Sequence, residues 1–163
     1  MDLRDYYTDE EKRKKMRARL SDLLRQHQND KIFLIAHSMG SIIAYDVLRQ
    51  FEKTEPTNVE HFVTMGSPLG LPFVTLKIRQ EFGATRSPEN VQRWTTIADP
   101  RDRVAIDCSL SDEYTANASG IQAQDILVHN GYVSPSEKKN HHKIYGYLRA
   151  PEFSDVIREF LTV

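Results

Sequence analysis

The chain has 163 residues, of which 39% are hydrophobic and 28% charged, a composition typical of one globular domain. Lys and Arg number 22 and Asp and Glu 23, so the net charge of −1 gives no bulk attraction to nucleic acid or to an anionic membrane. No apolar run approaches the ~20 residues of a membrane span, and the N-terminus lacks the apolar core of a signal peptide. The single cysteine, Cys108, excludes an intrachain disulfide framework, and together these features predict a cytoplasmic protein.

The first 30 residues predict one leading helix and no strand. Thr8 followed by Glu11 has the pattern of a capping box that opens a helix over 10–28. Apolar residues then recur at spacings of three and four, which places a narrow apolar stripe on one face, at Met16, Leu20, Leu23 and Leu24. The basic run at 12–15 follows three acidic residues, which favours a solvated helix face over a nucleic-acid patch.

From Ile32 onward, strands and helices alternate. The predicted strands cover 32–36, 59–65, 91–98 and 124–128, and the predicted helices cover 41–51, 73–82 and 151–161. The first strand is a continuous apolar run, which is typical of a strand buried on both faces. The closing helix carries an apolar face made of Phe153, Val156, Ile157, Phe160 and Leu161. This alternation predicts an α/β fold, a mostly parallel sheet with crossover helices, in a single domain over 1–163.

The segment from Ile32 to Ile43 places Ser38 between a buried strand and a helix with an apolar face. A nucleophile elbow requires this context, because its serine lies in a strained turn whose neighbours two residues before and after must be small. Those neighbours are Ala36 and Gly40. The turn would aim the Ser38 hydroxyl at the helix start, where the backbone N–H of Met39 and the helix dipole can stabilise an oxyanion. The alternative is that Ser38 only caps the helix.

An activated serine needs a base and a carboxylate that orients the base, and in this arrangement the chain order is serine, acid, histidine. Three carboxylates, Asp99, Asp102 and Asp107, follow the third predicted strand. Asp102 is favoured because the apolar pair Val104–Ala105 would anchor its loop, whereas Asp99 precedes a proline and is a natural turn former. The alternative for Asp102 is a solvated turn in which it pairs with a neighbouring arginine.

His142 is the predicted base, since it follows the fourth strand by a loop and precedes the closing helix. His141 and His129 are the lesser candidates. The other three histidines come too early in the chain or lie within a strand, and these are His27, His37 and His61. No carboxylate or cysteine is spaced to complete a metal site beside the histidine pair, so no metal and no cofactor are expected. Cys108 would need a low thiol pKa and a partner histidine to act as a nucleophile.

These segments resemble the lipase and esterase branch of the α/β-hydrolase superfamily. Residues 36–40 look like the elbow of small bacterial lipases, and 63–70 resemble the strand and loop that follow it. Residues 94–105 are similar to the acid segment, with Asp102 in the acid's place, and 140–148 resemble the histidine segment. The resemblance implies a serine hydrolase that cleaves a small or lipid-like carboxylic ester through an acyl-enzyme. Acyl transfer to an alcohol is a related reading.

The resemblance spans about 31–161 and fails before it. Family members carry further strands ahead of the elbow strand, and an early loop supplies a second oxyanion donor, which nothing in residues 1–30 resembles. The elbow strand would then expose an edge and an apolar face, and a lost donor costs on the order of 10²–10³ in rate. We therefore expect a second copy of the chain or a missing N-terminal segment to cover that edge. A degenerate binding or scaffold module is the alternative function. The loop 68–73 would line an acyl pocket or simply pack in the core.

Overall fold

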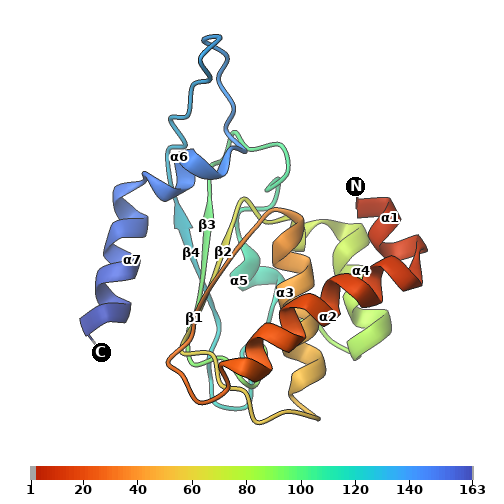
Figure 1. Cartoon of the computed structure of the whole chain (residues 1–163). Helices are drawn as coiled ribbons and strands as arrows, with labels where there is room; N and C mark the ends of the chain where they lie inside the picture. Colours follow the sequence, from red (N-terminus) through yellow and green to blue (C-terminus); the bar gives the residue numbers. More distant parts are fainter. Residues whose placement is uncertain (1–2, 163) are drawn as a thin grey trace.

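The computed structural model describes residues 3–162 and contains one four-stranded sheet (Figure 1). All strand pairs are parallel, and the strand order is β1 (Phe33–His37), β2 (His61–Met65), β3 (Trp94–Ala98) and β4 (Ala123–Leu127). The predicted α/β class and the parallel sheet are confirmed. The second and third strands are shorter than predicted, and the first and fourth are each displaced by one residue.

Helices connect and flank these strands. They are α1 (Leu3–Thr8), α2 (Glu10–Gln26), α3 (Met39–Phe51), α4 (Pro72–Phe82), α5 (Leu110–Glu113), α6 (Ile144–Leu148) and α7 (Pro151–Thr162), with a 3-10 turn η1 (Pro68–Gly70). The four longest were predicted, whereas α1, α5, α6 and η1 were not. In α7, Phe153 and Val156 are buried as expected, but Leu161 is 73% exposed, so its predicted place on the packed face was wrong.

The N-terminal region holds two helices, and the predicted capping box is wrong. Asp9 lies between α1 and α2 and caps α2, because its Oδ1 accepts a hydrogen bond from the backbone N–H of Lys12 at 3.0 Å. Thr8 ends α1 instead, and its hydroxyl donates to the carbonyl of Arg4. The N-cap of α2 is therefore the short polar side chain of Asp9, one residue after the predicted Thr8.

Helices lie on both sides of the sheet (Figure 1). A hydrophobic core fills the space between the sheet and the helices on each side. Side chains alternate between the two cores along each strand, so Phe62 and Trp94 pack with α3 on one face, while Val63 and Ile97 pack on the face covered by α7. Trp94 is fully buried and lies 5.6 Å, centroid to centroid, from the ring of Phe62. The sheet is therefore held between helices on both sides, which fixes the ends of its strands.

A buried polar network joins the N-terminal helices to α3 and α4. The guanidinium of Arg17 in α2 forms an ion pair with Asp46 through Nη2, and its Nη1 lies 2.6 Å from Glu81 Oε1. The hydroxyl of Tyr6 donates to Asp46 at 2.6 Å. Leu23, predicted within the apolar stripe, is 52% exposed, so the buried face of α2 centres on an arginine rather than on a continuous leucine stripe.

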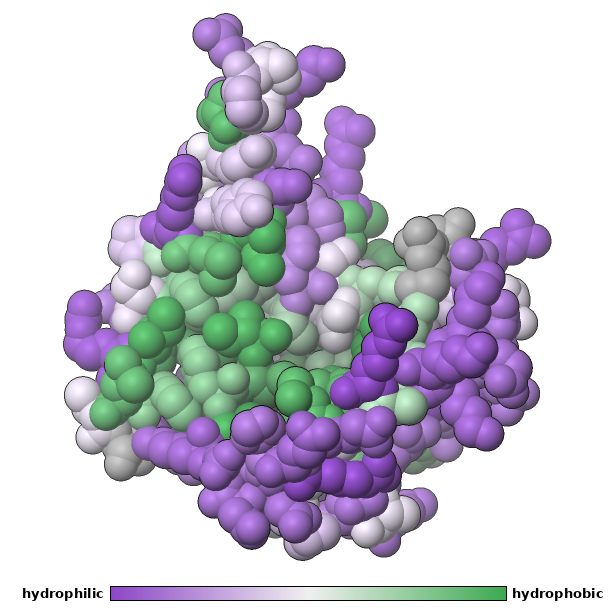
Figure 2. Space-filling model, in the orientation of Figure 1, coloured by the Kyte–Doolittle hydropathy of each residue, from purple (hydrophilic) through white to green (hydrophobic). Residues whose placement is uncertain are grey.

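The elbow strand β1 forms one edge of the sheet, since it pairs with β2 alone among the strands of the described region. Ile35 is 39% exposed and Phe33 and Leu34 are only half-buried, so the prediction of a strand buried on both faces was wrong. Figure 2 shows a hydrophobic area on this side of the protein, between α7 and α2. The expected open edge and exposed apolar face are present. Every helix in residues 3–162 is too short or too polar to span a lipid bilayer.

Candidate active site

The turn between β1 and α3 holds Ser38 in a strained backbone conformation. Its φ is 54° and its ψ is −133°, and a positive φ is unusual for a residue with a Cβ. The backbone N–H of Ser38 donates to the carbonyl of Met65 at 3.1 Å, which ties the turn to the end of β2. Ser38 occupies the N-cap position of α3, but its side chain makes no capping hydrogen bond to the helix, so the alternative that this side chain serves only as a cap was wrong.

The Ser38 hydroxyl instead contacts a histidine and, through it, a carboxylate. Ser38 Oγ lies 2.8 Å from His142 Nε2, and His142 Nδ1 lies 2.8 Å from Asp102 Oδ2. The three residues follow β1, β3 and β4, whose carboxyl ends share one edge of the parallel sheet. Asp102 is buried, and its other oxygen accepts a hydrogen bond from the backbone N–H of Val104 at 2.9 Å. The structure thus brings together the three residues selected from the sequence.

Tyr147 and Gly66 surround the Asp102–His142 pair, and sequence reasoning missed both. The buried hydroxyl of Tyr147 donates to Asp102 Oδ2 at 2.7 Å and accepts from the backbone N–H of Asp99. Gly66 has a φ of 51°, and a Cβ placed there would lie 2.8 Å from Asp102 Oδ2. The sequence offered one signal for Tyr147, an aromatic residue a few positions after the predicted base.

The loop that carries His142 is held from two directions. Asn130 is fully buried, and its side-chain amide donates to the backbone carbonyls of His141, at 2.7 Å, and Lys143, at 2.9 Å. His37 Nε2 lies 2.8 Å from the His142 carbonyl, so this nitrogen carries the proton and donates. Burial lowers the pKa of His37, outweighing the opposite effect of that hydrogen bond, and keeps the ring neutral.

The competing acids have other partners. Asp99 pairs with Arg101 and accepts a hydrogen bond from the backbone N–H of Asn130. Burial raises the pKa of Asp99, but these hydrogen bonds outweigh it and hold the pKa at about 2. Asp107 caps a local turn at the backbone N–H of Ser109. Both carboxylates therefore support loops.

The competing histidines and the thiol lie outside the Ser38 contact. His129 Nδ1 contacts Arg101 at 2.7 Å, and His141 Nδ1 lies 3.1 Å from the carbonyl of Asn130. His61 is buried beside Thr95, as its position in a strand predicted. The thiol of Cys108 donates to the carbonyl of Ala105, and burial raises the pKa of this thiol. A protonated thiol is a weak nucleophile.

Gly40 differs from what its sequence context suggested, whereas the loop 68–73 was expected either to line an acyl pocket or to pack in the core. A Cβ added at Gly40 meets no atom within 4 Å in the described region, so the steric requirement for a small residue is not seen at that position. In the loop, Leu69 is fully buried whereas Phe73 is 47% exposed.

Among residues 3–162, no group of three or more His, Cys, Asp or Glu side chains could hold a metal ion.

Comparison with known proteins assigns the chain to a family. The family described as "Alpha/beta hydrolase of unknown function (DUF900)" matches residues 2–104, well over half of the chain. The match includes Ser38 and Asp102 and ends before His142. No curated protein and no solved structure matches the chain.

Proposed function

The chain belongs to this family of α/β-hydrolases, and from that premise we propose that it is a serine hydrolase that cleaves carboxylic esters, with Ser38 as nucleophile, His142 as base and Asp102 as the orienting acid. The observation that carries the proposal is the unbroken contact from Ser38 Oγ through the His142 ring to Asp102, with 2.8 Å at each step. Hydrogen bonds of this length are what proton transfer between a nucleophile and its base requires.

The proposed reaction has two steps. Ser38 Oγ attacks the ester carbonyl while His142 Nε2 takes the hydroxyl proton, and the carbon–oxygen bond to the alcohol then breaks as His142 returns that proton to the leaving alcohol. Water next attacks the acyl-enzyme and gives a proton to His142. The bond to Ser38 breaks, the carboxylic acid leaves and Ser38 regains its proton. Asp102 stays ionised throughout and stabilises the imidazolium.

Negative charge on the carbonyl oxygen needs hydrogen-bond donors. Met39 is the first residue of α3, so its backbone N–H has no partner within the helix. It also lies at the positive end of the helix dipole. We therefore assign the Met39 N–H as one oxyanion donor, a group worth on the order of 10²–10³ in rate.

A fluorophosphonate probe tests the proposal, because it reacts with activated serines and adds a defined mass. We expect one adduct on the wild-type chain and none on Ser38→Ala, read by intact mass. His142→Ala and Asp102→Asn should label about 10²–10⁴ times more slowly, since general-base catalysis is lost. No adduct on the folded wild-type chain, or an equal adduct on Ser38→Ala, contradicts the proposal.

Two matched variants separate the triad from neighbouring groups of the same type. His129→Ala and Asp107→Asn remove a histidine and a carboxylate that bond elsewhere in the site region. Both should label at close to the wild-type rate. If either slows labelling as much as its triad counterpart, the assignment of His142 or Asp102 is wrong.

The open edge of β1 favours a second candidate function, binding through that edge. β1 leads directly into the elbow, and Ile35 on it is 39% exposed. A second copy of the chain or a further polypeptide segment laid along β1 would cover this surface and could supply another oxyanion donor. A folded chain that takes no adduct would favour this binding role over catalysis.

A further inference from the structure

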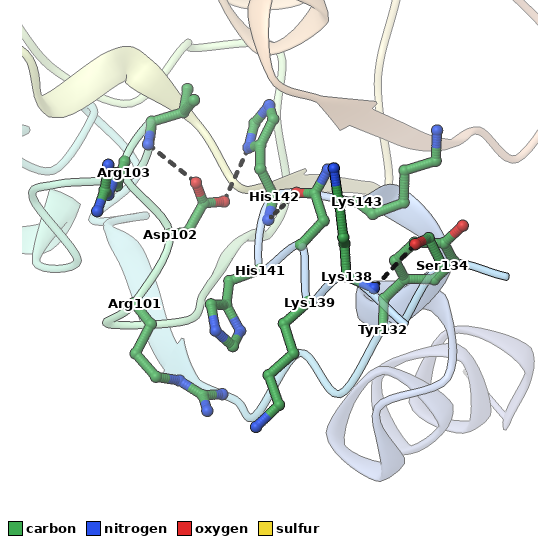
Figure 3. A pocket seen from close by; sticks show the side chains of 12 residues that line it. Arg101, Asp102, Arg103, Tyr132, Ser134, Lys138, Lys139, His141, His142 and Lys143 are labelled. Carbon is green, nitrogen blue, oxygen red and sulfur yellow. Dashed lines mark hydrogen bonds and ion pairs between the residues drawn. The ribbon is translucent and has the colours of Figure 1, made fainter. Parts of the chain in front are cut away.

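A cleft beside the triad has a strongly positive lining. Its volume is about 640 Å³, and Asp102 and His142 form part of its wall. The charged residues that line it are one acid, Asp102, and five cations, which are Arg101, Arg103, Lys138, Lys139 and Lys143. Figure 3 shows these side chains around the loop that carries His142. A chain of net charge −1 therefore concentrates positive charge at one place, next to its candidate catalytic histidine.

Most of this positive charge is not neutralised by the protein. Arg101 is paired with the buried Asp99, but the other four cations make no ion pair within the region that the structure describes. Asp102 cannot serve them, because its two oxygens already accept from His142, Tyr147 and the backbone of Val104. Lys143 lies over the ring of Tyr145, 5.6 Å from its centroid, a contact that leaves its charge in place. Cations without a carboxylate partner that gather in a cleft raise the local concentration of anions there.

The cations on the far wall are held by an ordered hairpin. Val133 and Lys139 form an antiparallel bridge, and the backbone N–H of Ser134 donates to the carbonyl of Lys138 at 2.9 Å. The hairpin stands out from the body of the protein beside α6 (Figure 1). Its returning segment leads directly into the loop of His142, so the backbone of Lys138 and Lys139 lies a few residues before the candidate catalytic histidine.

We propose that this cleft binds an anionic group, a carboxylate or a phosphate, on the alcohol part of the ester substrate. The proposal deepens the proposed function and rests on it. The side of the substrate follows from the chemistry, because His142 returns its proton to the leaving alcohol, which must therefore lie beside the histidine whose loop lines the cleft. Ser38 does not line the cleft, so the anion lies away from the carbonyl under attack.

Matched esters test which part of the substrate carries the charge. The acetyl esters of 3-hydroxyphenylacetate and of 3-hydroxybenzyl phosphate place a carboxylate or a phosphate on the alcohol, and the acetyl ester of 3-hydroxyphenylacetamide is the neutral control. Phenyl hydrogen adipate carries a carboxylate on the acyl part, and its amide is the neutral counterpart. We expect kcat/KM to be about 10-fold higher for the anionic alcohols than for the neutral one, as several exposed cations each contribute modestly. We expect no such preference in the adipate pair.

Charge removal tests the cleft itself. Lys138→Gln combined with Lys139→Gln should reduce the ratio of anionic to neutral kcat/KM about threefold, and Arg103→Gln should reduce it further. The matched control is Lys14→Gln with Lys15→Gln, an adjacent pair of exposed lysines on α2, which should leave the ratio at its wild-type value. Added salt should lower the wild-type ratio, because exposed charges are screened.

Three outcomes are decisive. The anion site is overturned if the ratio of anionic to neutral kcat/KM is near one in the wild-type chain. It is also overturned if the ratio is unchanged when the charges of Lys138, Lys139 and Arg103 are removed. In both cases fluorophosphonate labelling and neutral-ester hydrolysis still support the serine hydrolase. A preference that appears only in the adipate pair overturns the placement on the alcohol. A folded chain that neither takes the probe nor cleaves any ester overturns the proposed function, and the anion site as a substrate site with it. The carboxylate and phosphate esters, compared directly, identify which anion the cleft prefers.

Discussion

Gly66 is a position where the triad itself depends on the absence of a side chain. Its φ of 51° lies in the region that glycine adopts without cost. An added Cβ would lie 2.8 Å from Asp102 Oδ2, 2.9 Å from the ring of Tyr147 and 3.3 Å from His142 Nδ1. Cβ atoms essentially never approach other heavy atoms to less than 3.0 Å, so the Asp102 carboxylate, the Tyr147 ring or the backbone must move.

Gly66→Ala should therefore damage the triad more than the fold. We expect fluorophosphonate labelling to slow at least about 10-fold, because small misplacements of catalytic groups are costly in rate. The free energy of unfolding should fall by about 1–3 kcal/mol, from overpacking and the unfavourable φ. Labelling rate and urea denaturation measure the two effects on the same sample.

Gly40→Ala is the matched control, since Gly40 is the glycine two residues after Ser38 and its added Cβ meets nothing within 4 Å. Labelling and stability should stay close to the wild type. A large loss of labelling in Gly40→Ala would show that a further polypeptide segment packs against Gly40 at the elbow, as the open edge of β1 suggests. Unchanged labelling in Gly66→Ala would contradict the steric argument.

Which helices could be predicted from the sequence depended on their length, because only a long helix shows the recurrence of apolar residues that identifies it. The helices of 11 residues or more, α2, α3, α4 and α7, present enough turns for an apolar period to be seen. The helices of four to six residues, α1, α5 and α6, present one turn or little more, so no period can emerge. The buried Arg17 could not be predicted either, because its partners Tyr6, Asp46 and Glu81 come from three different helices.

The Arg17 network should be the main polar support of the N-terminal helices. Among residues 3–162, Arg17→Ala leaves the buried carboxylate of Asp46 with only the Tyr6 hydroxyl as a side-chain partner. Breaking a buried pair by removing one member costs about 3–5 kcal/mol. We expect a loss of that size in urea denaturation.

The exposed pair of Arg158 and Asp155 provides the comparison. Its side chains are 72% and 61% exposed, and the N–O distance is 2.8 Å. Arg158→Ala should change the free energy of unfolding by less than about 1 kcal/mol, the usual contribution of a surface pair. Equal losses for the two variants would mean that the Arg17 network gives no more stability than a surface contact.

For the protein as a whole, strand ends explain why the triad could be predicted while its surroundings could not. Parallel strands bring their carboxyl ends to one edge, so residues after the strands, such as Ser38, Asp102 and His142, become candidates for one site. For Tyr147 the sequence offered only an aromatic residue a few positions after the base. The supports from Asn130 and His37 depend on the path of the loop that carries His142, which no local pattern encodes. The positive cleft likewise joins two segments far apart in a chain with almost no net charge. The apolar run of β1 wrongly predicted burial on both faces, because such a run looks the same in a central and an edge strand. Its edge position was expected only because nothing in residues 1–30 resembles the earlier strands of the family.

The pH dependence of stability should reflect His61. Its side chain is 1% exposed, Nε2 lies 2.8 Å from Thr95 Oγ1, and Nδ1 has no hydrogen-bond partner among the described residues. Burial, with a smaller effect from the charge of Arg93, lowers the pKa of His61 from 6.5 to about 4. A protonated ring would bury a charge and an unpaired N–H, so the folded state holds the ring neutral.

The sign follows from which state binds the proton more readily. His61 takes up a proton near pH 6.5 in the unfolded chain but only near pH 4 in the folded chain. The contribution of neutral His61 to the free energy of unfolding is therefore complete above pH 6.5 and declines as the pH falls to about 4. The loss attributable to His61 reaches about 3 kcal/mol, and the lowered pKa of His37 adds a loss in the same direction. Urea denaturation at pH 7, 6, 5 and 4 measures it. In His61→Gln, which can still bond to Thr95, the decline across this window should be clearly shallower, and an identical decline in the variant would show that His61 is not its source.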